Sequence, residues 1–181
     1  MSPLPIDLGD GAQLRRYTLD DADELFALVD ANRDRLSVWM PWAPLTRTVD
    51  DQRVWLRSVL ADDANLEGTA LTVRGRLAGG VGLTAGPFGI WAELGYWVDR
   101  HHERQGLVTR ACRAFIDLAF GELGVHRVAI RAGVENGRSR AIPERLGFTL
   151  EGVHRGEGKG IDGFHDLCVY GLLEDEWQIR P

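Results

Sequence analysis

Cysteine is scarce in this sequence. Only two of the 181 residues are cysteines, Cys112 and Cys168. Two such widely separated residues cannot form the disulfide framework that stabilises small secreted domains. Each lies in an apolar stretch, which predicts two buried free thiols. No cysteine or histidine follows the adjacent His101 and His102 at the spacing of metal ligands, so we expect no metal site.

Long apolar runs and an excess of positive charge are also lacking. No apolar stretch approaches the roughly 20 residues that cross a bilayer. Met1–Asp10 has no basic region followed by an apolar run, as a signal peptide would. We therefore expect a soluble, cytoplasmic protein. The net charge of −6 argues against broad binding of nucleic acid and mildly favours cationic partners.

Internal repeats, low-complexity tracts and long linkers are absent as well. With 44% hydrophobic and 27% charged residues, the composition is that of an ordinary globular protein. A chain of this length fits one domain, so we predict a single domain over residues 1–181.

The spacing of apolar residues predicts mainly helices in the first third of the chain and mainly strands after it. The helical period and capping residues predict five helices: one begins at Thr18 or Asp20, and the others span Asn32–Met40, Val49–Leu60, Leu107–Gly121 and Ser139–Leu146. Alternation predicts seven strands, at Gln13–Tyr17, Thr69–Val73, Leu77–Leu83, Trp91–Val98, His126–Ala132, Phe148–His154 and Phe164–Leu173. This order indicates an α+β fold, a mixed and mostly antiparallel sheet of about seven strands covered by helices on both faces.

One strand, loop and helix form a unit that suits phosphate binding. The strand ends at Val98, the loop follows, and Gly106 opens the next helix. The first amides of a helix have no partners within it, and the helix dipole favours an anion there. Arginines and histidines gather around this loop: Arg100, His101, His102, Arg104 and Arg110. The alternative is a plain strand–turn–helix with a solvated basic face, since the loop has no Gly-Lys-Ser/Thr sequence.

Four short motifs, taken in order, resemble the GCN5-related N-acetyltransferase (GNAT) family, most closely its RimJ/RimL type of ribosomal-protein N-terminal acetyltransferases. They are Glu93-Leu-Gly-Tyr-Trp-Val, Gln105-Gly-Leu-Val-Thr109, Asn136-Gly-Arg-Ser139 and Ala141-Ile-Pro-Glu-Arg-Leu-Gly-Phe148. The segments Asn32-Arg-x-x-Leu36, Trp39-x-Pro-Trp42, His165-Asp166, Tyr170 and Glu176-Trp177 are similar to that group too. The resemblance covers nearly the whole chain.

The resemblance implies the GNAT fold and transfer of acetyl from acetyl-CoA to a primary amine. The acceptor would be a protein N-terminal α-amine or a small-molecule amine, and a homodimer is a further expectation. Another acyl-CoA such as succinyl-CoA, or a CoA-binding sensor without turnover, stays an alternative. The resemblance assigns cofactor contacts to Trp97, Val98, Arg104, Gln105, Gly106, Leu107, Val108, Thr109, Asn136 and Ser139.

Within that set, the backbone of Trp97 and Val98 would hold the pantetheine arm and the amides of 104–109 the pyrophosphate. Glu103 and Val108 depart from the family's loop pattern. Asn136 would bind the amide arm of the cofactor, or it could simply cap the helix that follows. Pro143 predicts that this helix is short or kinked at its start, because proline lacks an N–H.

The catalytic prediction rests on Glu93 as general base and Ser139 as a hydrogen-bond donor to the sulfur. Alternation puts Glu93 on the same strand face as Gly95 and Trp97. Glu157 and His165 are alternative bases. An α-amine, with a pKa of about 7.7–8.0, needs only a modest base.

Three tryptophans lie in the N-terminal helical region, and by resemblance Trp39 and Trp42 would form a wall for the substrate. The alternative is core packing. The glycines of 156–160 suggest a mobile flap on the acceptor side.

Overall fold

A mixed sheet of eight strands forms the centre of the computed structural model, which describes residues 3–61 and 66–178. The first strands are β1 (Ile6–Gly9), β2 (Ala12–Arg16), β3 (Thr69–Val73), β4 (Arg76–Ala85) and β5 (Trp91–Val98). The others are β6 (Arg127–Gly133), β7 (Thr149–Gly160) and β8 (Gly163–Leu173). Their order is β1-β2-β3-β4-β5-β6-β8-β7, and only β5 and β6 among these neighbours run parallel.

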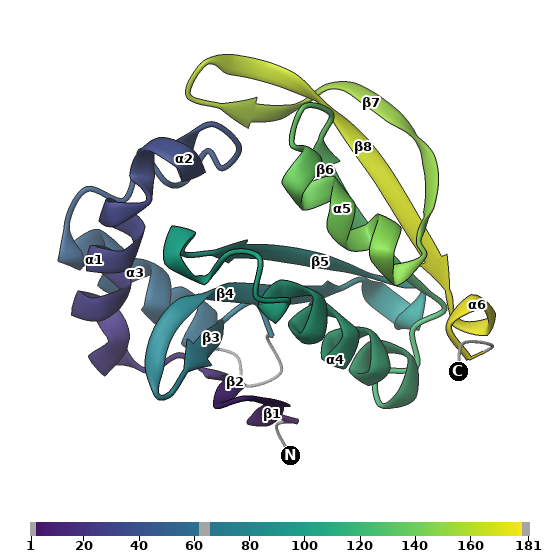
Figure 1. Ribbon diagram of the computed structural model, residues 1–181, viewed down its shortest axis with the longest axis horizontal. Coiled ribbons are helices and arrows are strands. Elements are labelled where there is room, and N and C mark those ends of the chain that lie inside the picture. Colours follow the sequence, from purple (N-terminus) through teal and green to yellow (C-terminus); the bar gives the residue numbers. More distant parts are fainter. Residues whose placement is uncertain (1–2, 62–65, 179–181) are drawn as a thin grey trace.

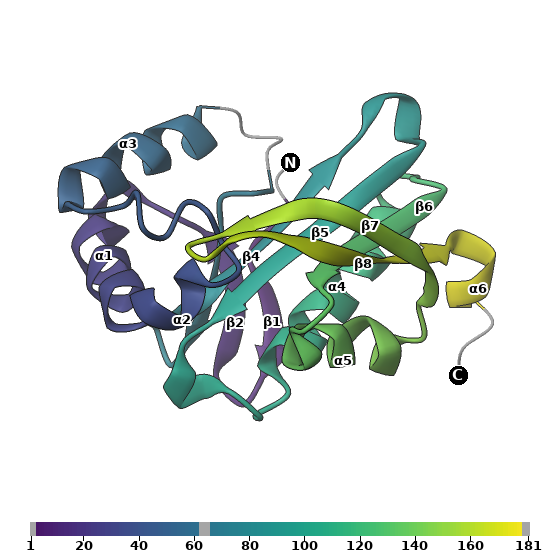
Figure 2. The ribbon, with the colours of Figure 1, turned by 90° about the horizontal axis from the view of Figure 1, so that it is seen from above.

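Helices cover both faces of the sheet, as the sequence predicts. They are α1 (Ala22–Ala31), α2 (Arg33–Ser37), α3 (Val49–Leu60), α4 (Leu107–Gly121), α5 (Gly137–Leu146) and α6 (Glu174–Gln178). Figure 1 shows α1 and α3 together on one side of the molecule and α4 and α5 on the other. The same division is visible from above (Figure 2).

Alternation along the strands explains the two layers. In β3, Ala70 is buried in a cluster with residues of α1 and α3, whereas its neighbour Leu71 is buried in a cluster with residues of α4. Successive side chains of a strand point to opposite faces, so each of the two cores is built from every second residue. Cys112 and Cys168 both lie in the α4 core as free thiols, which confirms the prediction for them.

The strand count is the main correction to the sequence prediction. The additional strand is β1, which pairs with β2 through a tight turn in which Gly9, Asp10 and Gly11 all have positive φ. Three consecutive residues in that conformation require the glycines on either side of Asp10. The Gly-Asp-Gly sequence at 9–11 therefore indicates a hairpin. The sequence prediction took only the strand after this turn and missed the strand before it.

The glycine-rich segment 156–160 is paired as strand rather than forming an irregular flap. Gly158 pairs with His165 and Gly160 with Gly163. A Cβ at Gly158 would lie 2.3 Å from the His165 ring, and one at Gly160 would meet the backbone oxygen of Val38. These glycines are thus needed for close packing, and the tip of the β7–β8 hairpin is tied to α2 by a hydrogen bond from Ile161 N to Ser37 O (2.8 Å).

Candidate functional site

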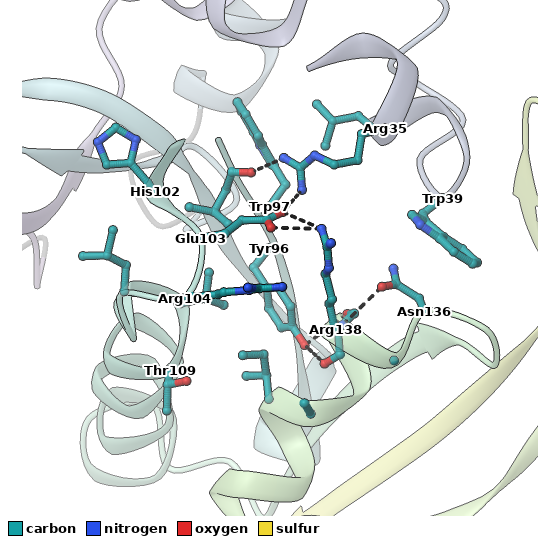
Figure 3. Close-up of a pocket in the computed structure, with 18 of the residues that line it drawn as sticks. Arg35, Trp39, Tyr96, Trp97, His102, Glu103, Arg104, Thr109, Asn136 and Arg138 are labelled. Carbon is teal, nitrogen blue, oxygen red and sulfur yellow. Dashed lines mark hydrogen bonds and ion pairs between the residues drawn. The ribbon is translucent and has the colours of Figure 1, made fainter. Parts of the chain in front are cut away.

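The central feature of the site is the divergence of β5 from β6. The two strands pair from Trp91 with Arg127 to Leu94 with Ile130, and no further. β5 nevertheless continues to Val98, paired with β4 alone. The backbone of residues 95–98 therefore has no strand partner on its β6 side, and a cavity of about 540 Å³ lies there (Figure 3).

The N-terminus of α4 forms one wall of this cavity. Gly106 stands at the helix N-cap with φ +72°, and a Cβ there would meet nothing within 4 Å. Glycine takes this left-handed conformation without strain and leaves the approach to the first amides open. The apolar residues that follow, Leu107 and Val108, anchor the helix in the core.

The cavity is rich in cations although the chain is acidic. Four arginines line it, against two glutamates, Glu103 and Glu135. The arginines are Arg35, Arg104, Arg138 and Arg145. A helix N-terminus surrounded by guanidinium groups is suited to a phosphate or pyrophosphate.

Glu103 is neutralised by two arginines from other elements. Arg35 of α2 lies 2.5 Å from one carboxylate oxygen, and Arg138 of α5 lies 2.9 Å from the other (Figure 3). Arg35 also donates to the backbone oxygen of Val98, and its buried Nε has no hydrogen-bond partner among the described residues. Glu103, which departs from the family's loop pattern, therefore holds two arginines at the cavity. These two arginines compensate the negative charge of Glu103 itself.

A buried polar pair holds the loop in place. The Asn32 amide donates to Asp99 (2.7 Å), and the Asn32 oxygen accepts from the backbone N–H of Arg100 (3.0 Å). Burial opposes ionisation of Asp99, but the hydrogen bonds from Asn32 and His102 outweigh it and lower its pKa. The asparagine of the Asn32-Arg-x-x-Leu36 motif thus has a structural role: it fixes the loop against the end of α1.

Asn136 and Ser139 lie together at the start of α5, and the capping alternative for Asn136 is correct. Its side-chain oxygen accepts from the Ser139 N–H at 3.2 Å. Both residues line the cavity, and the capping bond leaves the Asn136 amide nitrogen free of that contact.

Pro143 lies inside α5, which begins at Gly137, earlier than predicted, and runs without interruption to Leu146. Proline has no N–H to donate to the carbonyl of Ser139. The Tyr96 hydroxyl donates to that oxygen instead (2.9 Å), and the Ser139 hydroxyl donates to Tyr96 (3.3 Å). Burial raises the pKa of Tyr96, which keeps it protonated as a donor.

A second cavity, of about 330 Å³, lies on the other side of Trp97. Its aromatic lining comes from two loops, α3 and β5: Tyr17, Trp42, Trp55, Tyr96 and Trp97. Met40, Tyr96 and Trp97 line both cavities, so the two spaces meet at this part of β5. The arrangement provides a cavity of about 540 Å³ with cationic walls beside a smaller aromatic one.

The three candidate bases have different surroundings. Glu93 is held by Arg131 through two hydrogen bonds, of 3.0 and 2.7 Å, and lines neither cavity. Glu157 contacts the same Arg131 and His154; these contacts, the hydrogen bond from His154 first, lower its pKa and make it a weaker base. The His165 ring packs edge-on against Trp39, 5.3 Å between centroids.

Nearly all of the predicted cofactor residues line the larger cavity. They are Trp97, Val98, Arg104, Gly106, Leu107, Val108, Thr109, Asn136 and Ser139. Gln105 is not among the lining residues, and its side chain donates to the His101 carbonyl (3.0 Å). The two predicted substrate residues are separated: Trp39 lines the larger cavity and Trp42 the second.

Sequence reasoning missed several lining residues. No local sequence pattern marks Arg35 or Arg138 as a lining residue. Both are oriented by Glu103, which is 68 and 35 positions away from them in the sequence. Gln52 and Glu67 line the second cavity from α3 and from the segment before β3. The polar Gln52 in the buried stripe of α3 was a signal that could have been noticed.

Comparison with known proteins agrees with this geometry. Residues 12–149 match the family model described as acetyltransferase (GNAT) domain, so the chain belongs to the GNAT family of N-acetyltransferases. It is 39% identical over 164 residues to the Bacillus subtilis (strain 168) "Putative ribosomal N-acetyltransferase YdaF", covering 87% of this chain and 88% of the relative. None of the helices within residues 3–61 and 66–178 is long and apolar enough to cross a membrane.

Solved structures share the whole fold. RimL, a ribosomal L7/L12 α-N-protein acetyltransferase in complex with coenzyme A, has a TM-score of 0.87 at 22% identity, covering 96% of this chain and 99% of its own. The microcin C7 self-immunity acetyltransferase MccE, in complex with acetyl-CoA and AMP, has a TM-score of 0.86 at 25% identity, covering 94% and 97%. The predicted RimJ/RimL-type resemblance and the GNAT fold are confirmed.

Proposed function

We propose that this protein transfers the acetyl group of acetyl-CoA to a primary amine, and that a protein N-terminal α-amine is the preferred kind of acceptor. The observation that carries the proposal is the junction of the splayed strand β5, the open N-terminus of α4 and four arginines at one cavity. The coenzyme A of RimL and the acetyl-CoA of MccE support the donor.

The residues present fit this cofactor. The amides at the start of α4, around Gly106, and the guanidinium groups of Arg104 and Arg138 would hold the pyrophosphate. The unpaired backbone of β5 at Trp97 and the Asn136 amide would bind the pantetheine arm. When bound, acetyl-CoA supplies a thioester whose acetyl group an amine can accept.

The acceptor would approach from the second cavity, which adjoins the first at Trp97. Trp42 would form part of its wall, and Trp39 would border the reacting end from the donor side. The name of YdaF supports a ribosomal-protein acceptor. The chemistry agrees, because an α-amine is appreciably neutral near pH 7 whereas a lysine amine is not.

For the reaction itself, Glu93 shares the strand face of Gly95 and Trp97 without lining either cavity, and it would receive the amine proton through water. Ser139 would donate a hydrogen bond to the departing sulfur. Its hydroxyl donates to Tyr96 in the structure and would exchange that hydrogen bond for one to the sulfur.

The test is to follow thiol release from acetyl-CoA with panels of amines, and to measure CoA affinity separately. Gly106→Glu should weaken CoA binding at least about tenfold, because a side chain and a negative charge enter the phosphate site. Gly124→Glu is the matched control: Gly124 also has positive φ, +60°, and open space around its Cβ, but it lines neither cavity.

The outcomes separate the proposal from its rivals. Equal affinities in the Gly106→Glu and Gly124→Glu variants would remove the α4 loop from the cofactor site. Turnover with succinyl-CoA but not acetyl-CoA would indicate the other donor. Tight CoA binding with no turnover on any amine would indicate a sensor.

A further inference from the structure

We infer that the second cavity selects a primary amine that carries a bulky apolar group next to the amine, such as a peptide whose first residue is Phe, Leu or Met. This inference rests on the proposed function and deepens it by naming the class of acceptor. Four observations on the cavity carry it: its aromatic frame, the open space at Gly95, an unpaired amide at Gln52 and a carboxylate at its edge.

Two edge-to-face aromatic pairs frame the cavity. Trp42 stands 6.2 Å from Trp97 between ring centroids, and Tyr17 stands 5.5 Å from Trp55. Trp42 and Trp55 each leave more than a third of their surface exposed, although large aromatic side chains are normally covered. Apolar rings left open around a cavity of about 330 Å³ are suited to bury an apolar group of the ligand.

Gly95 supplies the space for such a group. It faces the second cavity from β5, opposite Gly82 of β4, on the same strand face as Glu93 and Trp97. A Cβ at Gly95 would meet nothing within 4 Å, so the space is not filled by a neighbour. Gly95 also has no positive φ, so its backbone gives no reason for glycine. The absence of a side chain here leaves room beside the reacting amine.

Gln52 gives the cavity a polar contact that nothing else uses. Its residue is 4% exposed and lines the cavity, yet within the described part of the chain its side-chain amide has no hydrogen-bond partner. The amide atoms are not among the fully buried side-chain atoms without a partner, so they remain accessible to a ligand or to water. An amide offers one acceptor and two donors, which match the C=O and N–H of a peptide bond.

A carboxylate stands at the edge of the same space. Glu67 lines the cavity and accepts a hydrogen bond from the Thr84 hydroxyl at 2.6 Å. Its negative charge favours the approach of an ammonium group, which loses its proton only at the reacting position. The cavity therefore combines apolar walls, one peptide-like contact and a charge complementary to an amine.

The experiment compares kcat/KM for four peptides that differ only in the first residue (Phe, Leu, Ala or Ser), and for 2-phenylethylamine, an amine of the same bulk without an amide. The expected result is a preference of about tenfold or more for Phe or Leu over Ala and Ser, as apolar pockets give for a few methylenes. Equal or better turnover of Ala and Ser peptides would overturn the inference while leaving the proposed function intact. Absence of turnover on every amine would instead defeat the proposed function.

Gly95→Val tests the space directly. It should lower kcat/KM for the Phe peptide at least about tenfold and for the Ala peptide much less, because only the bulky group meets the new side chain. Gly152→Val is the matched control, since Gly152 is also a strand glycine with open space but lies in β7, away from both cavities. A uniform loss over all peptides in Gly95→Val would count against selection by size.

Gln52→Met tests the amide. Replacing a buried amide that has no partner by an apolar side chain of similar length should leave the melting temperature unchanged or higher. The same change should lower kcat/KM for the Phe peptide several-fold more than for 2-phenylethylamine. Equal effects on the two amines would show that Gln52 does not bind the acceptor. Efficient turnover of 2-phenylethylamine by the native protein would show that the acceptor with the bulky group is a small free amine rather than a peptide.

Discussion

At the scale of single residues, the site is organised by arginines that each bind carboxylates from elsewhere in the chain. Arg131 holds both Glu93 and Glu157, as Arg35 and Arg138 hold Glu103. A carboxylate bound by a guanidinium group is fixed in position.

Glu93→Gln should lower turnover at least about tenfold while CoA affinity stays nearly unchanged, because a carboxamide cannot accept the amine proton. The measurement is kcat against pH, together with CoA binding. Glu151→Gln is the control, since Glu151 also pairs with an arginine of β6, Arg127, but lines neither cavity. Unchanged rates of Glu93→Gln at every pH would exclude Glu93 as the base.

The residues that line the larger cavity were more predictable from sequence than the surroundings of the candidate bases, for a physical reason. A helix N-terminus binds phosphate through backbone groups, and the sequence marks its position with Gly106. A base is defined by what surrounds its side chain. Glu93 and Arg131 lie on different strands and are 38 positions apart in the chain, so no local sequence pattern predicts their contact.

At the scale of elements, α5 shows how one missing hydrogen bond is replaced. Pro143 leaves the Ser139 carbonyl without its partner in the helix, and β5 supplies the Tyr96 hydroxyl. The sequence predicted the defect at Pro143. It could not predict the replacement, because β5 reaches α5 only in the folded sheet.

Tyr96→Phe should therefore destabilise the protein by about 1–2 kcal/mol, since the Ser139 carbonyl loses its donor. In a Pro143→Ala background the same change should cost less, because an alanine in place of the proline brings a backbone N–H to that carbonyl. Urea unfolding of the two single variants and the double variant measures the coupling. Strictly additive free energies would show that the two donors do not share the Ser139 carbonyl.

The boundaries of elements followed the sequence where apolar periodicity was long and failed where packing decided. α3 and α4 span the predicted residues, Val49–Leu60 and Leu107–Gly121. By contrast, β7 extends to Gly160 because its glycines let the strand pass close to His165 and Val38. Such contacts form between distant parts of the chain, so composition alone suggested a flap.

At the scale of the whole molecule, the Asn32–Asp99 pair connects the N-terminal helices to the loop between β5 and α4. The pKa of Asp99 is lowered in the folded protein. A group whose folded pKa lies below its unfolded value stabilises the fold above the unfolded pKa, and that contribution is lost as the pH falls through the folded pKa.

Asp99→Asn should accordingly be less stable than the native protein by about 1–3 kcal/mol at pH 7, because a buried charge-assisted hydrogen bond is lost. The difference should begin to shrink as the pH falls below about 4, the ordinary pKa of an aspartate in the unfolded chain, and shrink further towards the lowered pKa of the folded protein. Urea midpoints measured across this range provide the check. A difference that stays constant down to about pH 2 would show that the ionisation of Asp99 does not contribute to stability.

The contact of the β7–β8 tip with α2 also makes the packing of the N-terminal helices depend on the last strands of the chain. The Trp39 ring lies against the backbone of Gly133 and against His165, and Ile161 is hydrogen-bonded to Ser37. The N-terminal helices leave the ribosome first, yet the strands that hold them are translated last. A nascent chain can therefore complete this packing only late, once β8 has been made, and a chain truncated before His165 would lack the ring that covers one side of Trp39.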